Sequence, residues 1–377
     1  MKKILIIGAG GQIGSELTMR LRSVYGNENV VATDMRDCPM LAANGPFVQL
    51  NALDGEAYAE VVKKYKIDAI YNLVALLSAV GEANPQKAWQ INMGALMNSL
   101  EIAREYNCAL FTPSSIGAFG PNSPKVKTPQ DTVMRPTTIY GVCKVTGELL
   151  GDYYHKRFGV DTRSVRFPGL ISNVTLPGGG TTDYAVEIYY DAVKKGSYVC
   201  PIPSDVYMDM MYMPDALDAC IQIMEADPSK LVHRNSFNVT SMSFTPEMLY
   251  AELRKAMPGF TMTYDVDPVK ESIARSWPDS LDDTCAREEW GWKPKWDMKS
   301  MTEEGEGAYL MPGDRMSVPV VVRAAGPKFE TDTAEHLLRR ICLPDGVPSV
   351  SGRPRRCCPD SGCGERRPAR FPYRCRG

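Results

Sequence analysis

The chain has 377 residues, enough for one large domain or two coupled ones, and its 43 basic side chains nearly balance 45 acidic ones. The small net charge gives no reason to expect a nucleic acid or an anionic membrane as partner, and no apolar run approaches the roughly 20 residues of a membrane-spanning helix. The N-terminus lacks the features of a signal peptide, so we expect a cytoplasmic protein whose eleven cysteines are free thiols.

Apolar strand patterns alternate with helical patterns over the first 170 residues. A continuous apolar run at residues 3–7 predicts a parallel strand that is buried on both faces. Further strands are predicted at residues 30–33, 69–73, 109–112 and 162–167, and helices after residue 12 and at 57–65, 88–106 and 139–158. This alternation predicts an α/β fold with a doubly wound parallel sheet of the Rossmann type. After residue 170 the pattern loosens, and we expect residues 171–304 to form a smaller, irregular substrate-binding portion.

A glycine-rich loop follows the first strand. Residues 8–14 read GAGGQIG, with glycines at Gly8, Gly11 and Gly14. Such a loop lets the backbone and the following helix N-terminus approach a pyrophosphate. Asp34 ends the next strand, where its carboxylate can accept hydrogen bonds from ribose hydroxyls and repel a 2′-phosphate, which favours NAD over NADP; Arg36 weakens that preference. A plain strand–helix turn gives a similar glycine pattern. The glycine loop after the first strand, together with Asp34 at the end of the next strand, predicts an NAD-binding domain over residues 1–170.

A tyrosine and a lysine four residues apart carry the predicted chemistry. Tyr140 and Lys144 lie in the segment YGVCK at the start of a helix, so both project from one face. A nearby ammonium favours the phenolate form of tyrosine, which lets Tyr140 act as a general acid or base. Ser115 follows the strand at 109–112, where its hydroxyl can orient the reacting oxygen. By itself a tyrosine–lysine pair with this spacing is common on protein surfaces. The prediction therefore depends on its occurrence together with the glycine loop, Asp34 and Ser115.

Together these motifs resemble the extended short-chain dehydrogenase/reductase family. Gly8, Gly11 and Gly14 match its glycine motif, Tyr140 and Lys144 match its catalytic pair, and Ser115 matches its catalytic serine, with Ser114 as the alternative if the register slips by one. Residues 72–75 (NLVA) match the family motif that closes a strand of the sheet under the cofactor. Residues 167–170 (FPGL) match the segment whose backbone contacts the nicotinamide carboxamide in that family, the predicted nicotinamide segment. The resemblance implies that Tyr140 and Lys144 also contact the cofactor. It implies further cofactor contacts from Gln12, Ile13, Asn51, Ala52, Leu73, Val74, Ala75 and Phe167.

Within that family the chain is most similar to the epimerase-related L-threonine 3-dehydrogenases. The resemblance is carried by residues 72–85, 166–187, 212–216 and 273–294. It implies NAD-dependent oxidation of the threonine 3-hydroxyl to 2-amino-3-oxobutyrate, which loses CO2 to give aminoacetone or passes to a 2-amino-3-ketobutyrate CoA ligase to give glycine. It also implies a homodimer built from paired helices. The implied substrate contacts are Ser78, Ser115, Tyr140, Thr181, Thr182 and Trp277; loop capping and, for Trp277, core packing are the alternative roles.

Two other functions remain open from the sequence. A nucleotide-sugar epimerase or dehydratase uses the same tyrosine and lysine with a larger pocket, and a regulatory protein could bind NAD without catalysis. We expect no metal site, because the chain has three histidines and residues 1–304 contain no closely spaced Cys/His ligand set.

The last 73 residues differ in composition from the rest. Residues 305–377 carry 13 Lys and Arg against 8 Asp and Glu, whereas residues 1–304 carry 30 against 37. The tail is rich in Pro, Arg and Cys, which predicts disorder; the alternative is that its arginine clusters bind polyanions. We hypothesise that it derives from a shifted reading frame or an unrelated join, and we expect a chain ending at residue 304 to fold and bind NAD.

Overall fold

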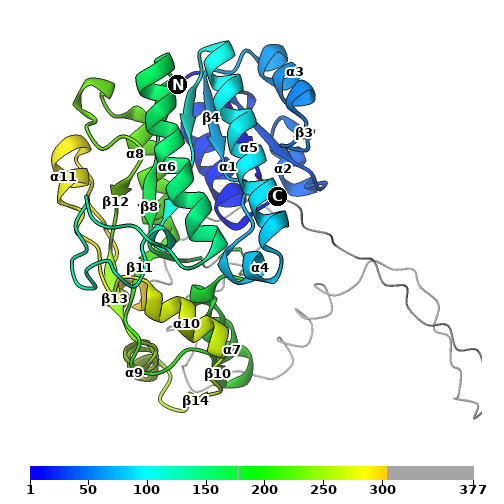
Figure 1. Ribbon diagram of the computed structural model, residues 1–377. Coiled ribbons are helices and arrows are strands. Elements are labelled where there is room, and N and C mark those ends of the chain that lie inside the picture. The colour runs from blue at the N-terminus through cyan, green and yellow to red at the C-terminus, as the bar shows by residue number, and fades with distance from the viewer. Residues whose placement is uncertain (173, 176–177, 304–377) are drawn as a thin grey trace, which may run out of the picture. The chain divides into compact units, whose positions relative to one another are not determined.

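A computed structural model describes residues 1–172, 174–175 and 178–303 (Figure 1). The tail predicted over residues 305–377 lies outside the described residues. All described residues belong to one compact unit. Among them, no helix combines the length and apolar character needed to cross a lipid bilayer.

Six parallel strands form the central sheet, in the order β3-β2-β1-β4-β5-β7. The strands are β1 (Ile4–Ile7), β2 (Val30–Asp34), β3 (Phe47–Gln49), β4 (Ala69–Asn72), β5 (Ala109–Phe111) and β7 (Thr162–Arg163). Strand order reverses between β1 and β4, which places their carboxyl ends at the switch point where doubly wound sheets bind ligands. The predicted Rossmann-type sheet is therefore confirmed.

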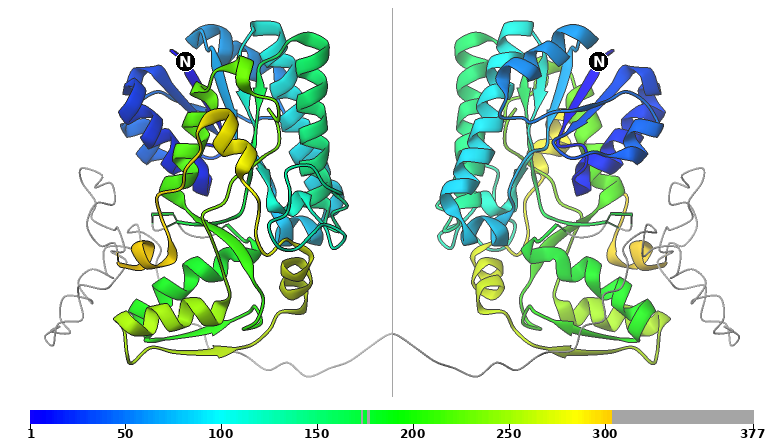
Figure 2. Two further views of the ribbon diagram at one scale, coloured as in Figure 1. Left: turned by 90° about the vertical axis from the view of Figure 1, so that its left-hand side faces the viewer. Right: turned by 90° about the vertical axis from the view of Figure 1, so that its right-hand side faces the viewer.

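Helices cover both faces of this sheet, as Figure 2 shows. Successive side chains of a strand point to opposite faces. Ile4 and Ile6 accordingly pack in one core with α1 and α8, whereas Leu5 and Ile7 pack in another with α3, α5 and α6. The helices are α1 (Gln12–Tyr25), α2 (Pro39–Ala43), α3 (Gly55–Tyr65), α4 (Ser78–Ala83), α5 (Pro85–Tyr106), α6 (Ile139–Phe158) and α8 (Met213–Glu225). Burial on both faces explains why the strand sequences are continuous apolar runs.

The strand predicted at residues 162–167 is wrong as a single element. Ser164 divides it into β7, at the edge of the central sheet, and β8 (Val165–Phe167), which pairs with β6 (Ser114–Ser115) and β12 (Phe237–Asn238). The amides of Leu110 and Thr112 donate to the carbonyl oxygens of Asp161 and Arg163, so the next amide of this ladder is that of Ser114. The amide of Ser114 instead donates to the Ser164 side chain at 3.0 Å, and the ladder resumes as the β6–β8 pair.

The chain after β8 forms smaller sheets and a second core. Its strands are β9 (Gly169–Ile171), β10 (Ser197–Cys200), β11 (Met208–Tyr212), β13 (Met242–Phe244) and β14 (Thr261–Tyr264); its helices are α7 (Tyr184–Lys195), α9 (Pro246–Ala256), α10 (Pro268–Ser276), α11 (Thr284–Trp290) and α12 (Met298–Glu303). Strands β13, β11 and β9 form one sheet, and β10 pairs with β14. Met213 and Ile223 of α8, however, pack with Ile4 of the central sheet. This part of the chain therefore contributes to the central core as well as to its own.

Candidate active site

The glycine loop joins β1 to α1 at the carboxyl end of β1. Gly8 has a φ of +81°, a conformation that favours glycine. A Cβ on Gly14 would lie 2.3 Å from the carbonyl oxygen of Gly8, so only glycine lets α1 begin this close to β1. A Cβ on Gly11 would approach only that same oxygen, at 3.4 Å. The loop surface at Gly11 is therefore open to a ligand, as the predicted pyrophosphate contact requires.

A fixed carboxylate lies beside this loop. Asp34 is 6% exposed, and its Oδ2 accepts a hydrogen bond from the Gly10 amide at 2.9 Å. Its Oδ1 accepts from the amide and the Nε of Arg36, at 3.0 and 3.1 Å. Burial alone would raise the pKa of Asp34, but the hydrogen bonds from Arg36 and Gly10 outweigh it and hold the pKa below its ordinary value. The carboxylate is thus ionised and oriented at the end of β2, where ribose hydroxyls can donate to it.

The structure adds Gly10, which sequence reasoning missed, to this end of the site and shows the contacts of Arg36. A Cβ on Gly10 would lie 2.9 Å from the Asp34 carboxylate, so Gly10 makes the contact between loop and strand possible. Arg36 pairs with Asp34 and donates to the Gly10 carbonyl oxygen at 3.1 Å. The second glycine of GAGG was the available signal for Gly10.

The remaining predicted cofactor residues lie along the same edge of the sheet. They are Gln12 and Ile13 in the first turn of α1, Asn51 and Ala52 after β3, and Leu73, Val74 and Ala75 after β4. Gly11, which precedes α1, offers no side-chain cap to the first turn of the helix. Free amides at a helix N-terminus bind the phosphates of a dinucleotide, and the Asp34 carboxylate accepts from a ribose. The residues present therefore fit NAD.

Ser115, Tyr140 and Lys144 converge on the segment that follows β5. A Cβ on Gly117 would lie 3.2 Å from the Tyr140 ring and 3.5 Å from the Ser115 Oγ, so both side chains meet over this glycine. The Lys144 Nζ donates to the Pro113 carbonyl oxygen at 2.6 Å and lies 5.2 Å from the Tyr140 ring centroid. The three predicted catalytic residues thus share one location. Sequence reasoning missed Gly117, whose lack of a side chain gives Tyr140 its place.

The predicted nicotinamide segment lies next to this group. Strands β6 and β8 pair in parallel, with Ser115 opposite Phe167. The Ser115 hydroxyl accepts a hydrogen bond from the Gly117 amide at 3.1 Å and keeps its own proton free to donate. Phe167 and Ser115 are therefore fixed relative to each other by a backbone ladder.

The predicted substrate residues fall into two groups. Ser78 begins α4, and its hydroxyl is 3.3 Å from that of Thr181, so these two side chains form one contact. Thr182 follows Thr181, and its side chain packs on the backbone of Gly169 in β9. Trp277 is 6% exposed and packs in a small apolar cluster with Ile116, Phe119, Ile273 and Leu281. Its position beside Ile116 agrees with core packing next to the Ser115 segment.

One trio of possible metal ligands occurs among the described residues, and none of its members is a predicted active-site residue. His233, Cys285 and Glu289 bring their ligand atoms within 4.8 Å of one another. The Nδ1 of His233 contacts one Glu289 oxygen, and the other accepts from the amides of Val232 and His233. The histidine and the carboxylate are therefore already engaged with each other. Sequence spacing did not show this trio, because its members come from a loop and from α11.

Glu16 links the cofactor end of α1 to the segment after β9. Its Oε1 accepts a hydrogen bond from the Ser172 hydroxyl at 2.5 Å. Burial raises the pKa of Glu16 to about 7, although the hydrogen bonds from Ser172 and Thr175 oppose the rise. A carboxyl whose pKa is higher in the folded than in the unfolded chain binds its proton more tightly when folded. The free energy of unfolding therefore falls as the pH rises from about 4.5 to 7.

We expect Glu16→Gln to remove this part of the pH dependence. Glutamine keeps an acceptor for Ser172 and stays neutral, so the variant should exceed the parent in stability by up to about 3 kcal/mol at pH 8 and show little difference at pH 4.5. Thermal unfolding from pH 4.5 to 8.5 measures the effect. Glu60→Gln, on the exposed side of α3, is the matched control and should leave the pH profile unchanged. An unaltered profile in Glu16→Gln would contradict the assignment.

The chain is similar to known proteins over most of its length. Residues 4–239 match the model of the NAD dependent epimerase/dehydratase family. An uncharacterised epimerase/dehydratase of Staphylococcus haemolyticus is 57% identical over 307 residues, which cover 80% of this chain and 96% of that protein. Two similar solved structures are L-threonine dehydrogenases. That of Clostridium difficile is 56% identical (TM-score 0.78; 80% and 95% of the chains covered), and the holo form of the GalE-like enzyme of Cupriavidus necator is 49% identical (TM-score 0.78; 79% and 97%).

These findings fix the cofactor and the general class of reaction. The matches leave about a fifth of this chain uncovered while spanning nearly all of the relatives, so the similarity lies in most of the chain but not in all of it. The cofactor is NAD, and the protein is an NAD-dependent oxidoreductase. The chain belongs to the NAD-dependent epimerase/dehydratase family.

Proposed function

We propose that the protein oxidises the 3-hydroxyl of L-threonine to give 2-amino-3-oxobutyrate. The observation that carries the proposal is the convergence of Ser115, Tyr140 and Lys144 on Pro113–Gly117, in a chain 49–56% identical to two L-threonine dehydrogenases. The chemistry that NAD would supply, when bound, is uptake of the hydride from the 3-carbon.

Side chains of this protein accept the proton that the threonine 3-hydroxyl loses. The phenolate of Tyr140 accepts the hydroxyl proton as the carbon–oxygen bond of the substrate becomes a carbonyl. The Ser115 hydroxyl donates to the same substrate oxygen and orients it. The Lys144 ammonium, held by the Pro113 carbonyl oxygen, stabilises the phenolate and is placed to hold the nicotinamide ribose.

We assign the predicted residues around threonine to its binding. Ser78 and Thr181 contact each other where α4 meets the segment before α7, and Thr182 lies against β9 next to the β8–β6 pair. The three hydroxyls offer hydrogen bonds to the polar groups of an amino acid. The position of Trp277 favours a supporting role behind Ile116 over direct contact.

Production of NADH from NAD and L-threonine tests the proposal. The full chain is incubated with NAD and either L-threonine or a UDP-sugar, and absorbance at the NADH band and sugar products are both followed. We expect NADH with threonine and no turnover of the sugar. Turnover of the nucleotide sugar without NADH from threonine would establish the epimerase or dehydratase alternative instead.

We place the reaction in the cytoplasm and ahead of a CoA-dependent cleavage. The six cysteines of the described residues are free thiols, which persist in a reducing compartment. The β-keto acid product readily loses CO2, so a 2-amino-3-ketobutyrate CoA ligase that captures it is the proposed metabolic link.

We further propose a homodimer formed through α5 and α6. The two helices pack side by side over one face of the sheet (Figure 1) and expose apolar side chains. These are Trp89 and Met97 on α5 and Val142, Leu149 and Tyr153 on α6, between 36% and 61% exposed. Their spacing follows one stripe on each helix, so a second copy can cover both stripes about a twofold axis.

Leu149→Glu is expected to dissociate this dimer. A twofold interface contains the substitution twice, so two carboxylates enter the apolar contact and the dissociation constant should rise by about 100-fold or more. Sedimentation velocity at several concentrations measures the change. Val24→Glu replaces a similarly exposed apolar residue on α1 and should leave the association unchanged. A Leu149→Glu variant that sediments like the parent would rule out this interface.

A further inference from the structure

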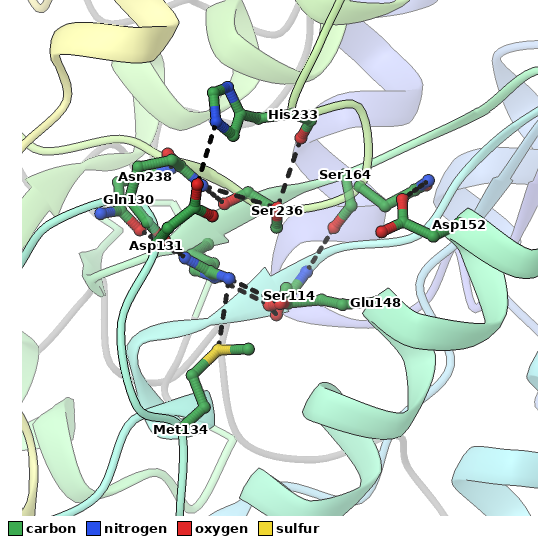
Figure 3. A network of polar contacts seen from close by, with 12 residues as sticks. Ser114, Gln130, Asp131, Met134, Glu148, Asp152, Ser164, His233, Ser236 and Asn238 are labelled. Carbon is green, nitrogen blue, oxygen red and sulfur yellow. Dashed lines mark hydrogen bonds and ion pairs between the residues drawn. The ribbon is translucent and has the colours of Figure 1, made fainter. Parts of the chain in front are cut away.

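A buried ion pair joins Glu148 in α6 to Arg166 in β8, and Glu148 also contacts Ser114 (Figure 3). Arg166 and Glu148 are 2% and 5% exposed, and the guanidinium Nε and Nη2 donate to the two carboxylate oxygens at 2.9 and 2.8 Å. The Ser114 hydroxyl donates to the same carboxylate. Both oxygens of Glu148 are therefore engaged, in a planar two-point contact that fixes orientation as well as distance.

Each member of this group is adjacent to a residue of the proposed active site. Ser114 precedes Ser115 in β6, and Arg166 precedes Phe167 in β8. Glu148 lies four residues after Lys144, one turn further along the same face of α6. The β6–β8 ladder places Ser114 opposite Arg166. The ion pair thus ties together the three elements that supply the serine, the tyrosine–lysine pair and the nicotinamide segment.

The remaining donors of Arg166 extend the contact to Gln130 and Asn238. Its Nη1 donates to the Gln130 carbonyl oxygen at 2.7 Å and to the Asn238 side chain at 3.2 Å. Asn238 in turn donates to the Asp282 carbonyl oxygen at 3.1 Å, in the segment that follows Trp277. The backbone of that segment is therefore linked to the Ser115 strand through buried hydrogen bonds.

Stability alone gives a weak account of this pair. Removing two charges from water is costly, and buried ion pairs are often replaced by apolar residues with no loss of stability. An apolar pair cannot form a directional hydrogen bond with the Ser114 hydroxyl. It therefore would not fix the orientation of Ser114 or of its neighbour Ser115. The geometry of the proposed site is sensitive to such placement, because a shift of about 1 Å can change a rate about 100-fold.

We propose that Glu148 and Arg166 are positioning residues that hold Ser115 against Tyr140 in the geometry needed for proton transfer. The inference rests on the proposed function only in assigning Ser115 and Tyr140 to the reacting oxygen. In this proposal they act through Ser114 and through the β6–β8 register.

Three variants separate positioning from support of the fold. Ser114→Ala removes one hydrogen bond and leaves the ion pair intact, so kcat for threonine should fall about 10-fold with little change in Tm or in the KM for NAD. Glu148→Gln should lower kcat about 100-fold and also lower Tm, because it leaves Arg166 without its counter-charge. The double variant Glu148→Met with Arg166→Met should regain stability but not kcat. A purely structural role predicts that activity returns with stability.

Asp161→Asn is the matched control. Asp161 pairs with two other buried guanidinium groups, those of Arg163 and Arg234, at the far end of the β7 strand. The substitution should lower Tm and leave kcat unchanged at a temperature where the protein is folded.

Hydrogen exchange gives a second measurement that needs no substrate. In the NAD-bound protein, exchange in residues 114–119, which include the Gly117 amide held by Ser115, should be about 10-fold faster in Ser114→Ala and in the double variant, but not in Asp161→Asn. If the parent produced no NADH from threonine, the proposed function would fail and this exchange result would still decide the inference. Unchanged exchange in residues 114–119 of both variants, or parental kcat in the double variant, would overturn it.

Discussion

Tyr140→Phe should abolish oxidation of threonine while NAD still binds. The substitution keeps the ring that packs over Gly117 and removes only the hydroxyl that takes the substrate proton. General acid–base catalysis by a placed side chain contributes about 100- to 10,000-fold, and we expect kcat to fall by roughly 1,000-fold or more. Initial rates of NADH formation measure the loss, and quenching of protein fluorescence measures NAD affinity, which should stay within about twofold because the glycine loop and Asp34 are unchanged.

Tyr207→Phe provides the control for this experiment, since Tyr207 is 45% exposed and lies before β11, outside the site. It should have parental rates. The result also separates the enzyme from a regulatory NAD-binding protein, for which the Tyr140 hydroxyl would be dispensable. A Tyr140→Phe variant with most of its activity would refute the assigned mechanism.

Gly14→Ala should disrupt NAD binding, and with it every NAD-dependent activity. The new Cβ would lie 2.3 Å from the Gly8 carbonyl oxygen and 2.8 Å from the Ala9 Cα. These are backbone atoms of the cofactor loop, so the loop or the start of α1 has to move. Overpacking of this kind costs about 1–3 kcal/mol, and we expect a rise of about 100-fold in the dissociation constant for NAD together with a lower Tm.

The suitable comparison is Gly259→Ala, in the turn before β14. A Cβ at that position meets no atom within 4 Å, so both NAD affinity and Tm should stay at their parental values. Titration calorimetry with NAD on the two variants measures the difference. Parental affinity in Gly14→Ala would mean that the nucleotide does not lie on this loop.

The first half of the fold follows from local sequence because burial on both faces of a sheet demands continuous apolar strands. Residues 3–7 and 30–33 were predicted as such strands, and the helix at 139–158 begins and ends as predicted, between the Thr138 cap and Gly159. The glycine loop could also be predicted, because its motif consists of consecutive residues. The exception is residues 162–167, where the break coincides with the contact of the Ser164 side chain with the Ser114 amide in the neighbouring segment, which no local pattern shows.

The candidate site also has features that local sequence predicts and features that depend on tertiary contacts. Spacing alone placed Tyr140 and Lys144 on one face of a helix, and the end of a strand placed Asp34 beside the loop. The meeting of Ser115 with Tyr140 over Gly117, the burial of Trp277 behind Ile116 and the bond between Ser78 and Thr181 join segments far apart in the chain.

The sequence by itself thus determined the sheet, the cofactor loop and the candidate chemical groups, because each depends on neighbours within a few residues. Only the tertiary structure decided which groups meet. The Arg166–Glu148 pair shows the reason. Its contact depends on the register between β6 and β8 and on the turn of α6 that faces them. This register follows from the packing of the whole core, so the spacing of Glu148 and Arg166 in the sequence does not predict it.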